Sequence, residues 1–239
     1  MSETCWWNGS LASRREVVIS PDDAGFRFGD GLFETLRVDE GIAQDIDAHL
    51  VRLYASLPKV ALAIPERPDT IAEAIAQVAQ AGPRPIARLR VTITRGHGGT
   101  PTRLIEAFPY EPPPSEPTVV LLPEFRVDSK GPLVRLKSLN YQMNRLALAR
   151  AHELGAWEAL LRNERGHLSE GSRSNVALAF EGQLWTPPLS DGCLPGTVRR
   201  RLLEEGLLAE RSLGSSELGR AERIYLMNSL IGLLPVRLA

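Results

Sequence analysis

Two anion-binding groups and one amine nucleophile stand out among the residues of this chain. Arg52 could give a phosphate dianion bidentate, permanently charged hydrogen bonds. Gly196 opens an expected helix whose free N–H groups, at Thr197 and Val198, could hold an anion. Lys137 could form an imine with a carbonyl group after losing its proton, which a partly buried, positively charged site favours. One interpretation of these residues is therefore covalent catalysis combined with anion binding.

Each of these residues also has a plainer interpretation. Taken alone, Arg52 reads as a solvated arginine on an amphipathic helix, and Lys137 as a surface lysine before a helix. An isolated glutamate such as Glu170 usually faces solvent. Lys137 is, however, the only lysine between Lys130 and the C-terminus, and it precedes Glu170 by 33 residues. Only several segments taken together outweigh the plainer interpretation.

Four groups of segments, spread over nearly the whole chain, carry a family resemblance. They are FGDGLFET (residues 28–35) with HLVRL (49–53), LKSLNY (136–141), GHLSEGSRSN (166–175), and LPGTVR (194–199) with NSL (228–230). Together these segments resemble the motifs of the class IV (fold type IV) aminotransferase family, whose cofactor is pyridoxal 5′-phosphate (PLP). No single segment would suffice for this resemblance.

The resemblance implies a role for each motif residue. Lys137 would form the Schiff base with PLP, and Glu170 would pair with the pyridine nitrogen and keep it protonated. Tyr141 would hydrogen-bond the ring oxygen. The other residues would bind the cofactor phosphate, and they are Arg52, Thr197, Val198 and Ser229. Family members commonly carry threonine at the position of Val198, so one side-chain hydrogen bond would come from Thr197 or be lost.

Elements that could position these residues can be predicted from periodicity. Asn8-Gly9 between hydrophobic residues predicts a strand hairpin. Apolar residues at three- and four-residue steps predict helices over Asp47–Leu57 and Asp69–Ala81, each beginning near an aspartate that could cap it. Strict alternation from Ile86 to Arg95 predicts a strand with one apolar face and one polar, doubly cationic face.

The second half of the chain predicts a further mixture of strands and helices. The expected elements are a strand at Thr118–Leu122, a helix at Tyr141–Leu154, hairpin strands at Ala159–Leu161 and Val176–Phe180, a short helix after Gly196, and a strand near Ile224–Met227. Elements mixed in this order are typical of an α/β or α+β fold.

A proline-rich stretch divides the chain nearly in half. Residues 109–117 contain prolines that cannot lie in a helix interior or a central strand. We therefore expect a smaller N-terminal α/β domain over 1–110, a linker over 111–117, and a larger C-terminal domain over 118–239 that carries Lys137. The resemblance implies a two-domain, D-amino-acid-aminotransferase-like fold with PLP between the domains, in a homodimer.

Composition excludes several other function classes. With 28 basic and 29 acidic side chains, the formal charge of −1 gives no net field toward nucleic acid or an anionic membrane. Cys5 and Cys193 lack disulfide-scaffold or zinc spacing, and the histidines show neither triad nor metal spacing, so no metal site is expected. Since no export signal or membrane-spanning stretch is seen, we expect a cytoplasmic enzyme with a small-molecule substrate.

The residues of the outer substrate pocket must distinguish between the possible reactions of the family. The segment from Asn228 to Val236 looks like the corresponding end of aminodeoxychorismate lyases, which release pyruvate to make 4-aminobenzoate for folate. Against this, Thr100 and Thr102 stand where those lyases have Arg and Tyr, and where D-alanine-type transaminases have the carboxylate-binding Arg and His. Phe33 stands at the position of the transaminase pocket tyrosine. The lyase is narrowly preferred, an amino-acid transaminase (D-amino acid or branched-chain) follows closely, and a catalytically inactive binding module is a distant third.

A negatively charged substrate still needs a cation. The polar strand face offers Arg90 and, secondarily, Arg88, while Arg27 and Arg95 are further candidates. The alternative is a set of solvated arginines on an edge strand.

Overall fold

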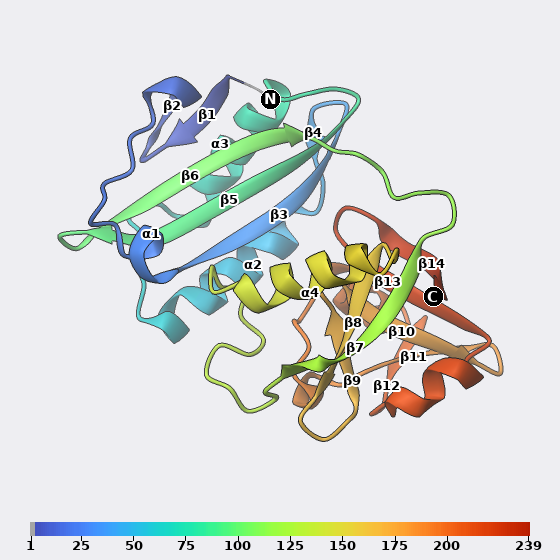
Figure 1. The fold of residues 1–239 in the computed structure, drawn as a ribbon. Coiled ribbons are helices and arrows are strands. Elements are labelled where there is room, and N and C mark those ends of the chain that lie inside the picture. Colours follow the sequence, from blue (N-terminus) through green and yellow to red (C-terminus); the bar gives the residue numbers. More distant parts are fainter. Residues whose placement is uncertain (1–2) are drawn as a thin grey trace. The chain divides into compact units, whose positions relative to one another are not determined.

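The computed structural model describes residues 3–239, which divide into two units with one sheet each (Figure 1). The first unit runs to Glu111 and includes Lys137–Asn140, while the second comprises Pro112–Leu136 and Tyr141–Ala239. The sequence predicts Lys137 in the C-terminal domain. The contacts of Lys137 instead group it with the first unit, because the segment that begins at Lys137 pairs with a strand there. The mixed α/β class is confirmed.

The first unit is an antiparallel sheet with strand order β2-β1-β6-β5-β3-β4. Its strands are β1 (Thr4–Trp7), β2 (Ser10–Ser13), β3 (Gly31–Asp39), β4 (Ile42–Ala43), β5 (Ile86–His97) and β6 (Thr100–Pro109). Its helices are α1 (Ala24–Phe28), α2 (Ile46–Ser56) and α3 (Pro68–Gln80), with short 3-10 turns at Arg14–Glu16 and Leu57–Val60. α2 packs against β3, and α3 packs against β5 and β6 (Figure 1).

Alternation along β5 gives the sheet one apolar and one polar face, as predicted. Leu89, Val91 and Ile93 are buried, whereas Arg88 is exposed and Arg90 is half-buried. The apolar side chains can pack with buried residues of α3, so burial of apolar area stabilises this side of the sheet. The edge-strand alternative is wrong, because β5 lies between β6 and β3.

The predicted hairpin and both predicted helices of this unit are confirmed, but their expected caps are not. α2 follows Asp45 and α3 follows Arg67, and neither of these residues makes a side-chain capping hydrogen bond. Asp47 and Asp69 lie in the first helical turns instead. An acidic side chain there interacts favourably with the helix dipole without capping the helix.

The second unit is built on a mixed sheet with strand order β12-β11-β10-β13-β14-β7-β8-β9. Its strands are β7 (Thr118–Val127), β8 (Glu158–Asn163), β9 (Leu168–Gly171), β10 (Asn175–Phe180), β11 (Gln183–Thr186), β12 (Leu208–Glu210), β13 (Arg223–Asn228) and β14 (Gly232–Leu238). Its helices are α4 (Gln142–Glu153) and α5 (Thr197–Glu204), with 3-10 turns at Leu189–Asp191 and Ser215–Arg220. Apolar side chains of α4 pack on β7 and β8, and those of α5 pack on β12 and β13.

The strand pairing in this unit differs from the expectation. The segments predicted as one hairpin are β8 and β10, which do not pair with each other. β8 pairs with β9, and β10 pairs with β11 and β13. Among residues 3–239, no helix combines the length and the apolar character that crossing a membrane would require.

Candidate active site

Lys137 is held along β3 of the first unit. The amide of Phe33 donates a hydrogen bond to the Lys137 carbonyl (2.9 Å), and the amide of Leu139 donates to the Gly31 carbonyl (3.0 Å). A Cβ at Gly31 would clash with the Ile93 carbonyl and the Leu139 side chain, so only glycine allows this close approach. The main chain around Lys137 is therefore fixed by a strand about a hundred residues earlier in the sequence.

The ring of Phe33 contacts two cations. Arg90 Cζ lies 3.8 Å from the ring centroid, and Lys137 Nζ lies 4.2 Å from it. Because the distances of 3.8 and 4.2 Å share one end point, the two charged groups lie within 8.0 Å of each other. Arg90 also donates a hydrogen bond from Nε to Oγ1 of Thr92 (3.0 Å). The structure thus brings together three of the residues predicted for catalysis and substrate binding.

The other predicted arginines have different surroundings. Arg88 is exposed and stacks on Phe108, with its Cζ 5.2 Å from the ring centroid. Arg27 is exposed and lies 3.4 Å from Asp22. Arg95 pairs with Asp30 (2.6 Å) and donates to the carbonyls of residues 60 and 61. Arg90 is therefore the predicted arginine that stacks on the same ring as Lys137.

The two threonines at the expected carboxylate-binding positions have different surroundings from each other. Thr100 is exposed at the start of β6. Thr102 donates a hydrogen bond to the buried carboxylate of Asp23 (2.5 Å), as does Thr94 (2.8 Å). Burial alone would raise the pKa of Asp23, but hydrogen bonds from Thr102, Thr94 and backbone amides outweigh it and lower that pKa. Since Asp23 also caps α1, Thr102 fixes this helix to the β5–β6 hairpin.

Arg52 is paired with an acid that the sequence analysis did not single out. Glu34 lies on β3 and accepts hydrogen bonds from Nε (2.8 Å) and Nη2 (2.5 Å) of Arg52. His49, also on α2, places Nδ1 at 2.7 Å from the same carboxylate. Both Glu34 and His49 are buried. Arg52 is therefore part of a buried polar cluster and not a solvated surface residue.

In the second unit, Glu170 lies on β9 and is held by the loop before α5. Its Oε2 accepts a hydrogen bond from the amide of Leu194 (2.8 Å). Asn175 donates from Nδ2 to the Leu194 carbonyl (2.8 Å), so both main-chain groups of Leu194 are used. A carboxylate can accept several hydrogen bonds, so this contact orients Glu170 without using up its capacity.

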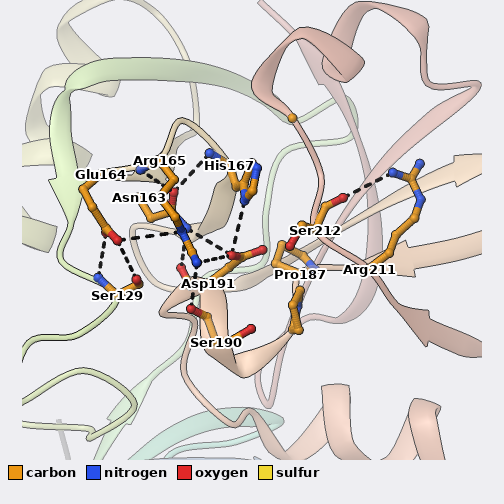
Figure 2. A network of polar contacts seen from close by, with 12 residues as sticks. Ser129, Asn163, Glu164, Arg165, His167, Pro187, Ser190, Asp191, Arg211 and Ser212 are labelled. Carbon is orange, nitrogen blue, oxygen red and sulfur yellow. Dashed lines mark hydrogen bonds and ion pairs between the residues drawn. The ribbon is translucent and has the colours of Figure 1, made fainter.

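A polar network joins the same two segments a second time (Figure 2). Oδ1 of buried Asp191, in the turn before α5, accepts hydrogen bonds from Asn163 (3.2 Å) and Arg165 (2.5 Å). His167 lies 3.4 Å from that oxygen. Asn163 ends β8, and Arg165 and His167 lie in the turn between β8 and β9. The network therefore fixes the strand that carries Glu170 relative to the loop that leads to α5.

Tyr141 contacts the turn that follows Glu170. Its hydroxyl donates a hydrogen bond to the Ser172 carbonyl (2.7 Å), and Asn144 donates to the same carbonyl (3.1 Å). Buried Glu158 on β8 organises this turn by accepting hydrogen bonds from the Arg173 amide (2.9 Å) and the Ser174 hydroxyl (2.7 Å).

The expected phosphate-binding segments of the second unit lie at a helix start and a turn. α5 begins after Gly196, which gives no side-chain cap, and Thr197 and Val198 are buried. The first N–H groups of a helix have no partner within it, so this end is suited to an anion. Ser229 is half-buried in the turn between β13 and β14.

Glu34 and Glu158 are the residues that the sequence analysis missed. Both could have been found as acids at buried positions of apolar strand patterns. Glu34 stands between Leu32 and Leu36 in an alternating stretch, and Glu158 precedes the apolar run that begins at Ala159.

Comparisons with known proteins identify relatives of this chain. The model of the amino-transferase class IV family matches residues 31–239. The chain is 28% identical to D-alanine aminotransferase from Bacillus licheniformis over 244 residues, covering 96% of this chain and 86% of that protein. It is also 28% identical to aminodeoxychorismate lyase from Bacillus subtilis over 250 residues, covering 95% and 84% of the two chains. The PLP-bound structure of a hypothetical aminotransferase from Mycobacterium tuberculosis superposes with a TM-score of 0.87 at 26% identity, covering 98% and 90%.

Proposed function

Because this chain belongs to the class IV aminotransferase family of PLP-dependent enzymes, we propose that it is an amino-acid transaminase with Lys137 as its catalytic lysine. The observation that carries this proposal is the ring of Phe33, which Lys137 and Arg90 both contact. An arginine on the same ring as the reactive amine is suited to the carboxylate of an amino acid whose amino group would replace the lysine on the carbonyl carbon of the cofactor. A neighbouring positive charge is also what an imine-forming lysine requires.

The residues present fit each functional group of PLP. The aldehyde needs an amine, which Lys137 provides, and the pyridine nitrogen needs a carboxylate, which Glu170 provides. The phosphate needs cationic and N–H donors, for which we propose Arg52 and the uncapped start of α5. When bound, the cofactor supplies an electron sink for the bond that breaks at the substrate Cα.

Each residue then has a defined task in the proposed reaction. Lys137 holds the cofactor between turnovers and carries a proton to and from the substrate Cα. Arg90 binds and orients the substrate carboxylate, so that the amino group faces the lysine. Glu170 keeps a proton on the pyridine nitrogen, and Leu194 orients its carboxylate.

A direct experiment tests the reaction class. The purified protein should carry a yellow chromophore and should transfer amino groups from D- or L-amino acids to pyruvate or 2-oxoglutarate. Separate assays of both enantiomers would define the stereochemistry. If the PLP-loaded protein shows no transfer with any donor of the panel, the transaminase proposal is wrong.

The second candidate function is aminodeoxychorismate lyase, which one feature of the structure favours. Arg88 and Arg90 lie two residues apart on the same face of β5, which could serve a substrate with two carboxylates. The Asn228–Val236 segment adds less than its sequence suggested, because a structural role explains its first residue. Asn228 accepts hydrogen bonds from the amides of Leu230 and Ile231 and donates to the Arg173 carbonyl. Release of pyruvate and 4-aminobenzoate from aminodeoxychorismate would identify the lyase.

A further inference from the structure

Three ionisable side chains are buried together beneath β3 of the first unit. The exposed fractions of the side chains are 1% for His49, 2% for Glu34 and 10% for Arg52. Burial of charged groups costs desolvation energy, and an apolar trio of similar volume often gives equal or greater stability. Stability alone therefore does not account for a charged cluster at this place.

The geometry of the cluster fixes the orientation of Arg52. Glu34 accepts from Nε at 2.8 Å and from Nη2 at 2.5 Å, so two nearly parallel hydrogen bonds define the plane of the guanidinium. His49 Nδ1, at 2.7 Å from Oε2 of Glu34, holds the carboxylate in turn. Both His49 and Arg52 come from α2, which packs on β3.

Glu34 remains charged over the working range of the protein. Burial would raise its pKa, but the charge and hydrogen bonds of Arg52 and the hydrogen bond of His49 outweigh burial and lower the pKa to about 2. The pairing with Arg52 is therefore present at every pH well above 2.

Glu34 comes directly after Phe33, whose ring contacts the proposed catalytic lysine, Lys137. Phe33 and Glu34 are both buried but point to opposite faces of β3, where Phe33 meets Lys137 and Glu34 meets Arg52. Two successive residues of one strand therefore hold the proposed cofactor lysine and the proposed phosphate arginine.

We propose that Glu34 is a positioning residue that orients Arg52 for the cofactor phosphate, with His49 holding the Glu34 carboxylate. This inference rests on the proposed function, because it concerns the phosphate of the same cofactor. An arginine that is already oriented raises the affinity for the phosphate, because no conformational entropy of its side chain is lost when the phosphate binds.

Loss of the Glu34 charge would have two opposite effects on phosphate binding, so the direction of the measured change is informative. Loss of the Glu34 charge would leave the surroundings of Arg52 more positive, and by charge alone this would tighten phosphate binding. Without its buried partner, however, Arg52 would turn toward water, as a buried cation without a counter-charge is unfavourable. We expect the loss of orientation to dominate and phosphate binding to weaken.

The test compares PLP with pyridoxal, which lacks the phosphate, by equilibrium dialysis against apo-protein. For each protein the ratio of the two dissociation constants reports the contribution of the phosphate alone. Arg52→Ala sets the scale for losing the phosphate arginine. We expect Glu34→Gln to weaken PLP binding at least tenfold while pyridoxal binding stays unchanged. Glu34→Asp keeps the charge, but its shorter side chain cannot hold Arg52 in the same place. It should therefore also lower the contribution of the phosphate to binding.

A matched control is available in the same unit. Glu66 forms a second buried ion pair, with Arg103 at 2.6 Å and exposed fractions of 9% and 8%. Glu66→Gln and Glu34→Gln should both lower the melting temperature of the apo-protein, but Glu66→Gln should leave the ratio of dissociation constants unchanged. The ratio thus separates positioning from general stability.

The possible outcomes distinguish this inference from the function on which it rests. A wild type that binds neither PLP nor pyridoxal would overturn the proposed function and the role of Glu34 together. If the wild type prefers PLP and both Glu34 variants keep that preference, or strengthen it, the positioning role alone is wrong. If Glu34→Gln does not fold, Glu34→Asp decides, because retained preference in it contradicts the proposal and lost preference supports it.

Discussion

Phe33 sets the spacing between a cation that can bind a carboxylate and an amine that can bind a carbonyl carbon. Arg90 and Lys137 both lie against this ring, whereas Arg88 lies against Phe108. Same-face neighbours on a strand are about 7 Å apart, so one carboxylate cannot engage both arginines equally. The two arginines should therefore differ in their effect on catalysis.

We predict that Arg90→Ala lowers kcat/KM by roughly two to three orders of magnitude, because a partly desolvated charge-assisted contact contributes about 3–4 kcal/mol. The absorption spectrum of the bound cofactor should barely change. Arg88→Ala should cause a smaller loss with a monocarboxylic amino acid and a larger one with aminodeoxychorismate. Steady-state kinetics of both variants on both substrates measure this, and full activity in both would refute the assignment.

Lys137→Ala should abolish steady turnover, because it removes the amine that holds the cofactor. The variant can be checked for folding by its melting curve. In the wild type, borohydride reduction followed by peptide mapping should find the pyridoxyl group on the peptide that contains Lys137. A pyridoxyl group on Lys59 or Lys130 would contradict the assignment.

Glu170→Gln should separate cofactor binding from chemistry. An amide keeps the size of the side chain, but it cannot hold a proton on the pyridine nitrogen as a carboxylate does. We expect PLP to remain bound, as judged by the chromophore after dialysis, while kcat falls. Wild-type kcat on every accepted substrate would remove Glu170 from the proposed mechanism.

At the scale of elements, the turn after β9 depends on one buried acid. Glu158 accepts hydrogen bonds from the Arg173 amide and the Ser174 hydroxyl, and the same turn presents the carbonyl bonded by Tyr141. A Cβ at Gly171 would clash with Glu158 and Ser174, so the turn is closely packed around this carboxylate. The stability of this turn therefore depends on a few short contacts of Glu158.

We predict that Glu158→Gln lowers the free energy of unfolding by about 1–3 kcal/mol, because a buried amide cannot replace every acceptor contact of the carboxylate. Urea denaturation measures the change. Glu124→Gln, at an exposed acid of β7, is the control and should stay within about 0.5 kcal/mol of the wild type. An equal effect of the two substitutions would contradict the role of Glu158.

The elements that could be predicted from the sequence are those with a clean local period. β5, α2 and α3 show apolar residues at strand or helix spacing, and the Asn8-Gly9 pair marks a hairpin. β3 and β6 were not predicted as strands, since Glu34 and Arg103 place charges on their buried faces. In each strand an ion pair compensates the buried charge, whereas the local sequence pattern treats such a charge as the end of a strand.

Pairing between distant segments could not be predicted, because it depends on contacts that local sequence does not describe. The segment after Lys137 joins β3, and β14 runs parallel to β7, each across about a hundred residues. For the same reason the motifs indicated Arg52, Lys137 and Phe33, but not the pairing of Arg52 with Glu34 or the contact of Lys137 with Phe33. Residue types were informative about chemistry, whereas orientation came from the fold.

At the scale of the whole molecule, the segment from Val18 to Phe28 of the first unit carries several of the most exposed large apolar residues that the structure describes. Val18, Phe26 and Phe28 are 78%, 74% and 68% exposed. Several large apolar side chains exposed close together in sequence are typical of a surface that a protein partner covers. A second copy of the chain is the simplest such partner, since most soluble oligomers are symmetric homo-oligomers.

We therefore predict that the enzyme is a homodimer in solution and that the segment around Phe26 and Phe28 lies in its interface. Replacing both with aspartate places two charges where apolar contact is required, so sedimentation velocity should show a shift toward monomer with retained secondary structure. Val51→Asp is the control, because Val51 is 59% exposed but stands on α2, outside this segment. A wild-type monomer at micromolar concentration would contradict the dimer. A double variant that remains fully dimeric would show instead that the interface lies on another surface of the chain.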